Sequence, residues 1–338
     1  EFRTYVGTIK KMRSLDIPTS RGCPYRCTFC VNALPAYKKW RPIKIKQVLS
    51  QIDYLVKKYN LNYLVFVDDL FFIRKDRVEK IARHLIKKKY NLMWEATARA
   101  DLFKPQQIDD KFLRLIKRSG CFVLKIGMES GSERILKLMK KDITIKQSIH
   151  AVKQCEKHGI IVNGGFMCGF PSETRGEIKE TAKLILKLRK ISPKSLLWAP
   201  TILRPYPGTE IYQECIKNGF KSPKTLREWA SKKLDVGSYI PIKDISWIKN
   251  PKWLLNFKTY FYILLVFKSH ELTKRKILFV WKFLAKIAEF RLNHNFWFFA
   301  IEPLFLINLR TFLDRGSITA RLAKNILNWQ PRYSLSQA

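Results

Sequence analysis

The chain has 338 residues, 46% of them hydrophobic, with seven cysteines and a formal net charge of +38. This length allows one barrel domain of about 200 to 250 residues, with a sizeable core, plus a smaller appendage. Disulfide frameworks are typical of short secreted chains with an even cysteine count, so we expect reduced thiols and a cytoplasmic location. The high charge predicts attraction to polyanions, either nucleic acid or an anionic membrane surface.

Short apolar runs alternate with amphipathic helix patterns along the first two-thirds of the chain. The predicted strands cover residues 15–19, 62–67, 92–97, 122–126, 160–167 and 195–202. The predicted helices cover residues 43–59, 76–89, 107–119, 132–139, 144–158 and 174–190. Six successive β/α units predict a parallel sheet with helices outside it. Right-handed crossovers curl such a sheet into a barrel, here a partial (β/α)6 TIM-like barrel of the α/β class.

Three cysteines follow the first predicted strand at the spacing C-x3-C-x2-C, namely Cys23, Cys27 and Cys30. The next cysteine is Cys121, and all five histidines lie far away in the sequence. A zinc site would need a fourth Cys or His at short range. A [4Fe-4S] cluster normally takes four thiolates, so three ligands leave one iron open to bind another molecule. The spacing therefore favours an iron-sulfur loop, placed at the mouth where barrel active sites form.

Charged residues follow the next two predicted strands. Asp68 and Asp69 come after the second strand, and Arg99 comes after the third. Taken alone, an acid pair also suits the entry of a helix. Arg99 suits either a bidentate contact with a carboxylate ligand or a structural ion pair with Asp101.

Glycine-rich segments follow the remaining predicted strands. Glu129 and Ser130 supply an acid and a hydroxyl after the fourth strand, while Ser132 is the expected N-cap of the next helix. Gly169 lies at the end of the fifth strand, where small residues let a ligand approach the backbone. The turn Pro207-Gly208-Thr209 follows the sixth.

Together these segments resemble the radical S-adenosylmethionine (SAM) superfamily, and within it the branch that carries a cobalamin-binding domain. The resemblance covers about residues 14–215 and extends to the aromatic residue before Cys30. It implies that Cys23, Cys27 and Cys30 hold a [4Fe-4S] cluster whose open iron binds SAM, and that electron transfer cleaves SAM to a 5′-deoxyadenosyl radical. It also implies that the following residues contact SAM: Phe29, Asp68, Asp69, Arg99, Glu129, Ser130 and Gly169.

The cobalamin domain of that branch precedes the barrel and contains a D-x-H-x-x-G loop. No histidine of this chain follows an aspartate by two residues, and the chain begins with Glu1 rather than Met. Cobalamin is therefore expected only if an upstream domain exists. The resemblance further implies an electron donor such as flavodoxin or ferredoxin, and chemistry such as methyl transfer or cyclisation. We expect a linker over residues 1–13 and the barrel over 14–215.

The sequence changes character from about residue 241, because the last 98 residues contain 19 of the 44 aromatic side chains. Apolar runs at 253–267, 277–290 and 296–307 are interrupted by charged residues or proline, so none predicts a membrane-spanning helix. Lysines interleaved with Trp and Phe suit helices lying in a membrane interface, or helices that bury their aromatic side chains against the barrel. We expect a mostly helical, aromatic- and Lys-rich extension over 216–338.

The sequence thus predicts a radical SAM enzyme that abstracts hydrogen from an apolar, lipid-like or membrane-associated substrate, and a location peripheral to the inner face of a membrane. The basic charge also favours an alternative, an RNA-modifying enzyme of the same superfamily. A third hypothesis is a binding protein in which the cluster is only structural.

Overall fold

The computed structural model describes residues 12–231, 245–267 and 278–294. The expected linker over 1–13 lies outside the described residues except at 12 and 13. The apolar run at 296–307 lies wholly outside them. The chain divides into two compact units, which we treat separately. The larger unit comprises Lys11–Ser222 and Ser246–Lys249, and the smaller contains the remaining residues.

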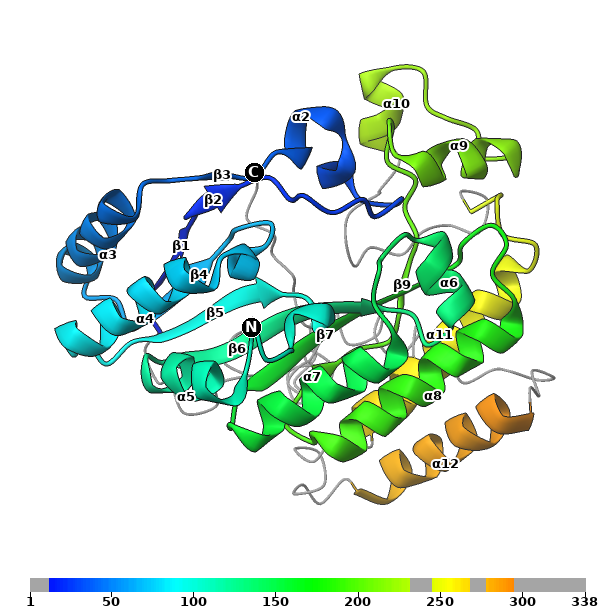
Figure 1. Cartoon of the computed structure of the whole chain (residues 1–338). Coiled ribbons are helices and arrows are strands. Elements are labelled where there is room, and N and C mark those ends of the chain that lie inside the picture. Colours follow the sequence, from blue (N-terminus) through cyan, green and yellow to red (C-terminus); the bar gives the residue numbers. More distant parts are fainter. Residues whose placement is uncertain (1–11, 232–244, 268–277, 295–338) are drawn as a thin grey trace, which may run out of the picture. The chain divides into compact units, whose positions relative to one another are not determined.

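The larger unit is built on a parallel sheet (Figure 1). Its main path runs in the order β1 (Ser14–Ile17), β4 (Tyr63–Phe66), β5 (Met93–Ala98), β6 (Cys121–Glu129), β7 (Ile161–Cys168) and β8 (Leu196–Leu197). A seventh strand, β9 (Thr201–Ile202), pairs with β7. Each pairing in this sheet is parallel, and spatial order follows chain order. Successive β/α units with same-handed crossovers produce this order, which confirms the predicted partial barrel fold.

Helices connect the strands and lie outside the sheet (Figure 1). They are α3 (Ile45–Tyr59), α4 (Lys75–Lys88), α5 (Asp110–Arg118), α6 (Glu133–Leu138), α7 (Ile145–Lys157) and α8 (Arg175–Ile191). Threonine N-caps begin α7 and α8, where Thr144 and Thr174 each form a capping box with the residue three positions later. Ser132 accepts a hydrogen bond from Ile135 N, which confirms its predicted capping role.

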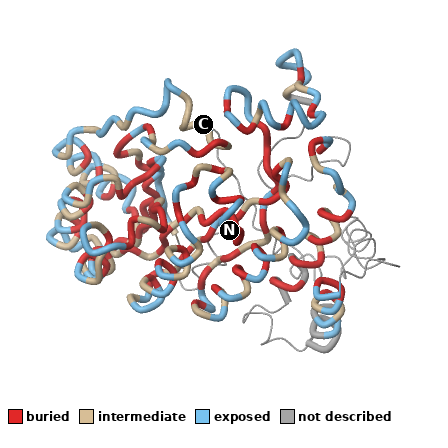
Figure 2. Tube along the Cα trace, turned by 45° about the vertical axis from the view of Figure 1, so that its right-hand side comes forward, coloured by how far each residue is buried: buried red, intermediate tan, exposed pale blue. Residues whose placement is uncertain are grey.

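The core lies between the sheet and these helices (Figure 2). Tyr63 and Leu64 of β4, Trp94 of β5 and Leu124 of β6 are all almost completely buried. A β-strand turns alternate side chains to opposite faces, so burial along most of β4 indicates that both faces of the sheet are covered.

Two local features differ from the sequence-based expectation. The predicted sixth strand divides into β8 and β9, and Pro200 between them has no N–H to continue a ladder. A short antiparallel ribbon, formed by β2 (Ser20–Arg21) and β3 (Arg41–Pro42), was not predicted. It brackets the cysteine segment together with the 3-10 helix Val31–Ala33 and the short helix α2 (Pro35–Lys38).

The described part of the smaller unit is helical. Its helices are α10 (Leu226–Ser231), α11 (Pro251–Phe267) and α12 (Leu278–His294). The guanidinium of Arg291 on α12 lies 5.4 Å from the ring centre of Tyr260 on α11, and both residues are buried. Within the described ranges, no helix is both long and apolar enough to span a bilayer, as the interrupted apolar runs predicted.

Candidate functional site

The cysteine loop, residues 21–30, contacts segments that follow several different strands. Thr28 N donates to Met139 O at 2.9 Å, and Ile211 N donates to Thr28 O at 3.0 Å. The ring of Phe29 packs edge-on against Phe170, with 6.4 Å between centroids. These partners follow β6, β9 and β7 in the chain. The loop therefore lies across the C-terminal ends of the strands, where the sequence placed it.

Cys23, Cys27 and Cys30 are all free thiols; Cys27 is buried and the other two are half-buried. Burial raises the pKa of Cys23 and Cys30, and the neighbouring loop thiols raise it further. In the described part of the chain, no three Cys, His, Asp or Glu side chains converge as a single metal ion would require. A [4Fe-4S] cluster uses one thiolate on each of several irons. The thiols of Cys23 and Cys30 both lie near that of Cys27, and three neighbouring thiolates are a donor set that such a cluster takes.

Asp68 anchors the segment that leads into the cysteine loop. Its side chain is buried and accepts hydrogen bonds from Thr19 N at 3.2 Å and Thr19 Oγ1 at 2.9 Å, and another from the hydroxyl of Ser20. Burial raises the pKa of Asp68, while these donors oppose the rise. The carboxylate at the end of β4 therefore fixes the backbone just before the loop. Its predicted contact with SAM stays a prediction.

Asp69, the next residue, holds the loop itself. Its carboxylate accepts from Gly22 N and from Asn32 Nδ2, each at 2.7 Å. Gly22 has φ = +85°, and a Cβ there would collide with the carbonyl of Lys39. Only glycine suits this conformation and this close approach. Asp69 thus joins the two ends of the cysteine segment, and its predicted SAM contact is likewise still a prediction.

Arg99 lies at the end of β5 beside the loop. Its Nε bonds to Asp101 Oδ1 at 2.9 Å, and its Nη2 donates to Lys141 O at 2.5 Å. Its Nη1 lies 3.9 Å from Cys27 Sγ. The ion pair with Asp101 that the sequence allowed is therefore present, and the guanidinium also faces a cysteine of the loop.

Glu129 ends β6 in a left-handed conformation, with φ = +60°. Its buried carboxylate pairs with Lys141 Nζ at 2.8 Å. A Cβ on Gly127 would collide with this carboxylate, so the glycine makes room for the pair. A non-glycine residue with positive φ is strained, and such residues concentrate at functional sites. Lys141 was not predicted as a site residue, because it lies 12 residues from Glu129 in the sequence and pairs with it only in the folded structure.

Ser130 is fully buried. Its Oγ lies 3.2 Å from Thr181 Oγ1 on α8 and accepts from Ser132 N at 3.1 Å. Gly131 N also donates to Thr181, at 2.9 Å. The hydroxyl therefore fastens the turn after β6 to α8. The predicted contact of Ser130 with the nucleoside of SAM is not tested by this arrangement.

Gly169 adopts φ = +81° in the turn after β7. Its N–H and that of Phe170 donate to Glu173 Oε2 at 2.5 and 3.2 Å, and its carbonyl accepts from Trp247 Nε1 at 2.9 Å. The buried Oε1 of Glu173 has no hydrogen-bond partner among the described residues. Burial raises the pKa of Glu173 to about 7. Neither Glu173 nor Trp247 was predicted to take part in the site, although Glu173 ends the Gly-Phe-Pro-Ser-Glu turn that follows β7.

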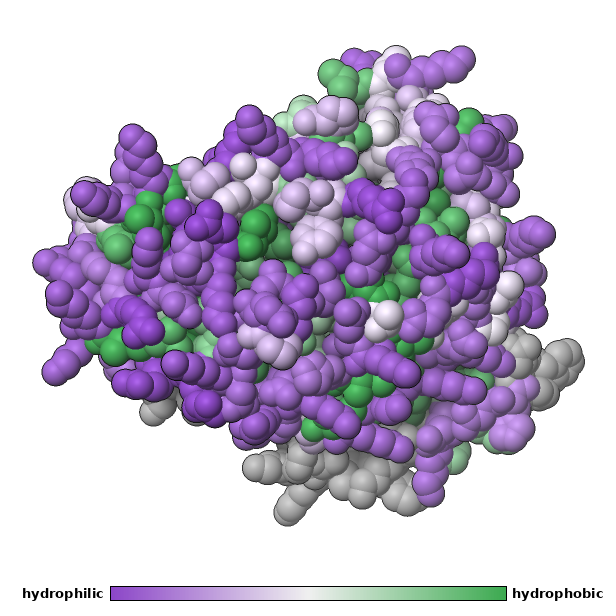
Figure 3. Space-filling model, in the orientation of Figure 1, coloured by the Kyte–Doolittle hydropathy of each residue, from purple (hydrophilic) through white to green (hydrophobic). Residues whose placement is uncertain are grey.

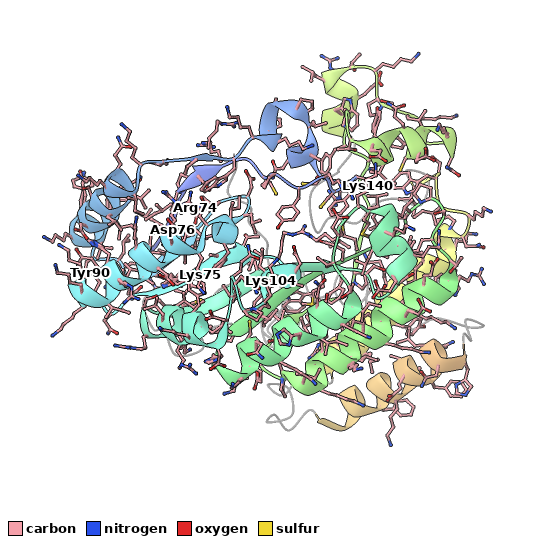
Figure 4. All side chains as sticks on the ribbon, viewed as in Figure 1. Arg74, Lys75, Asp76, Tyr90, Lys104 and Lys140 are labelled. Atoms are coloured by element: carbon pink, nitrogen blue, oxygen red, sulfur yellow. The ribbon has the colours of Figure 1, made fainter. Side chains whose placement is uncertain are left out.

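The outer surface of the barrel carries many charges, and hydrophilic side chains cover most of the face in Figure 3. Many basic groups there have acidic partners. Arg74 and Asp76 lie together at the start of α4 (Figure 4), with Nε 2.8 Å from Oδ1. Lys140 pairs with Glu210 at 2.7 Å. Each such pair offsets, at its own place on the surface, a positive charge that could otherwise contact a phosphate backbone.

A groove with a volume of ≈ 590 Å³ runs between α4 and α5. Basic side chains outnumber acidic ones along it. The basic residues are Lys75, Arg83, Lys111, Arg114 and Arg118, and the acidic residues are Glu79 and Asp109. Lys75 pairs with Asp109 at 2.7 Å. The groove thus keeps an excess of positive charge.

Curated relatives match nearly two-thirds of the chain. An uncharacterized methyltransferase of Pyrococcus horikoshii is 34% identical over 216 residues, which cover 64% of this chain and 45% of that protein. The anaerobic magnesium-protoporphyrin IX monomethyl ester cyclase of Rubrivivax gelatinosus is 28% identical over 219 residues, covering 63% and 37%. The chain therefore spans less than half the length of these relatives. Their identities agree with the predicted branch of methyltransferases and cyclases.

Solved structures with the same fold include two radical SAM enzymes. The cobalamin-dependent enzyme OxsB superposes with a TM-score of 0.57 at 19% identity, covering 96% of this chain and 50% of that one. The methyltransferase TsrM of Kitasatospora setae, solved with cobalamin and a [4Fe-4S] cluster, gives 0.52 at 18% identity, covering 62% and 38%. At this identity the likeness is one of fold. The model of the radical SAM superfamily matches residues 17–185, half of the chain, and the chain belongs to that superfamily of enzymes.

Proposed function

We propose that Cys23, Cys27 and Cys30 hold a [4Fe-4S] cluster and that the enzyme uses it to cleave SAM. The observation that carries this proposal is the set of three free thiols in a loop fixed across the strand ends by Asp68, Asp69 and their partners. A cluster held there would supply one electron to SAM, breaking its C–S bond to give methionine and a 5′-deoxyadenosyl radical that would remove hydrogen from carbon. A reductant such as flavodoxin or ferredoxin is the proposed source of that electron.

The protein's own residues orient the reactants and exclude water from them. We assign SAM contacts to Phe29, Asp68, Asp69, Arg99, Glu129, Ser130 and Gly169. The strained backbone of Glu129 supports this, since non-glycine residues with positive φ concentrate at functional sites. Holding a radical and its target close together without solvent is the contribution that side chains make to such chemistry.

We propose the complete reaction only as a class of chemistry, because the chain spans less than half the length of its curated relatives. Those relatives are named as a methyltransferase and a cyclase, and either chemistry suits the barrel. Cobalamin takes part only if the full-length protein has a domain for it. We keep residues 14–215 as the catalytic barrel and 216–338 as a helical extension, in a cytoplasmic protein.

We propose an apolar or membrane-associated substrate on the basis of α12. Phe283 and Phe290 are 58% and 53% exposed, and their spacing of seven residues puts them on one helix face with the exposed Lys286 between them. Sedimentation with anionic liposomes tests this surface. The double variant Phe283→Ser/Phe290→Ser should bind less lipid, while Tyr54→Ser/Tyr59→Ser on α3 should bind as wild type does. Equal binding by both variants would remove the proposal.

The groove between α4 and α5 supports the alternative substrate, RNA. Neutralising phosphates with basic side chains releases counterions, so such binding must weaken steeply with salt. Arg83→Glu/Arg118→Glu should abolish salt-dependent RNA binding if the groove is used. If this variant and the wild type bind RNA equally weakly, RNA is rejected as the ligand of this groove.

The catalytic proposal is tested by anaerobic reconstitution followed by assay of 5′-deoxyadenosine. We expect the full chain to take up four irons per protein and to form 5′-deoxyadenosine from SAM under reduction. Cys27→Ala should lose the cluster, whereas Cys155→Ala, which alters a buried thiol of α7, should keep it. A full cluster that leaves SAM intact would support a structural role instead.

A further inference from the structure

Arg99 is the most completely enclosed cation beside the cysteine loop, with 5% of its surface exposed. Asp101 and the carbonyl of Lys141 fix two sides of its guanidinium. The third side presents Nη1 to Cys27 Sγ at 3.9 Å. A buried guanidinium anchored in this way has little freedom to turn elsewhere, so its direction toward the sulfur is set by the fold.

The same guanidinium also contacts the loop at a second point. Its central carbon lies 3.5 Å from the ring centre of Tyr25, which is the midpoint between Cys23 and Cys27 in the sequence. The Tyr25 hydroxyl in turn lies 3.4 Å from Asp101 Oδ2. The Arg99–Asp101 pair at the end of β5 therefore contacts the loop at the side chain of Tyr25 as well as at the sulfur of Cys27.

From this geometry we propose that Arg99 donates a hydrogen bond to the cluster-ligating sulfur of Cys27 and thereby raises the reduction potential of the cluster. The inference rests on the proposed function, because it requires that Cys27 be a cluster ligand. Hydrogen bonds to the sulfurs and nearby charge are among the factors that set cluster potentials. A fixed positive donor stabilises the form with one more electron, and burial strengthens this effect by lowering the local dielectric. Arg99 is thus a positioning residue that makes reduction easier.

This role is separate from the predicted contact between Arg99 and the SAM carboxylate. An effect on the cluster is present before SAM binds, whereas an effect through SAM appears only in its presence. The potential of the cluster without SAM therefore distinguishes the two roles.

The loop contains its own matched control. Arg26 lies directly before Cys27 in the sequence, but it is exposed and forms a bidentate pair with Asp142, with both distances 3.1 Å. Solvent screens an exposed charge. Arg26→Lys should therefore leave the potential unchanged.

The test is an electron paramagnetic resonance titration of the reconstituted full chain with dithionite and redox mediators, without SAM. We expect Arg99→Lys and Arg99→Gln to keep their iron but to be harder to reduce. The expected loss is about tenfold in the equilibrium constant for one-electron reduction, or about 59 mV. Asp101→Asn keeps a side-chain oxygen that can accept from Arg99 Nε but removes the negative charge, so it should shift the potential in the opposite direction.

Potentials equal to wild type in the Arg99 variants and in Asp101→Asn would overturn the inference. If the Arg99 variants do not bind iron, the test rests on Asp101→Asn. A cluster potential equal to wild type in that variant would contradict the electrostatic role. A wild-type chain that takes up no iron would instead contradict the proposed function, so the two failures are distinguishable.

Discussion

The two sides of the cysteine loop are each fastened by an arginine and an aspartate, but in different surroundings. On the inner side, the side chains of Arg99 and Asp101 are 6% and 19% exposed, and on the solvent side those of Arg26 and Asp142 are 64% and 45% exposed. Exposed pairs contribute little to stability because water and salt screen them. Buried pairs cost desolvation energy and need further partners. The inner contacts should therefore decide the loop's geometry, while the outer pair is dispensable.

The largest effect is expected on the inner side, at Asp68. Asp68→Ala removes the acceptor of Thr19 and Ser20 and leaves buried donors without partners, which should cost about 3 kcal/mol in the free energy of unfolding. Urea unfolding of the full chain measures this. Asp69→Ala, on the more exposed neighbour, should cost about 1 kcal/mol. Equal losses would show that burial does not set the strength of these carboxylate contacts.

A pH-dependent effect is expected at Glu173, which supports the turn that places Phe170 against Phe29. Its pKa of about 7 lies above the ordinary 4.5, so the stability associated with the protonated native carboxyl is complete below pH 4.5 and lost as pH rises through 7. Glu173→Gln stays neutral. Its stability relative to wild type should grow by on the order of 2 kcal/mol between pH 5 and pH 8. A difference independent of pH would contradict this assignment.

The smallest effect is expected on the solvent side. Replacing Asp142 by Asn breaks the pair with Arg26 and should change the free energy of unfolding by less than about 1 kcal/mol, and less still in high salt. Thermal unfolding at two salt concentrations tests both statements. A larger loss would show that the outer pair also holds the loop.

The order of strands and helices was predictable because periodicity and turn residues are local properties. Predicted and observed bounds agree within a few residues from the first strand to α8. The sixth strand was predicted as continuous, and Pro200 divides it by removing one backbone donor. The ribbon of β2 and β3 was too short for its alternation to be recognised.

The positions that form the site were predictable from the sequence, but the side-chain contacts between them were not. Parallel strands bring their ends to one edge, so Asp68, Arg99 and Glu129 could be placed together from order alone. Their partners depend on folded geometry, as in the bond between Asp68 and Thr19, 49 residues away. Lys141 escaped prediction for the same reason.

The central claim is that three cysteines leave one iron open for SAM. Electron paramagnetic resonance of the reduced, reconstituted chain with and without SAM tests it most directly. We predict that SAM changes the spectrum of the cluster in the wild type and in Arg26→Lys. A spectrum unaffected by saturating SAM, in a chain with a full complement of iron, would contradict the claim.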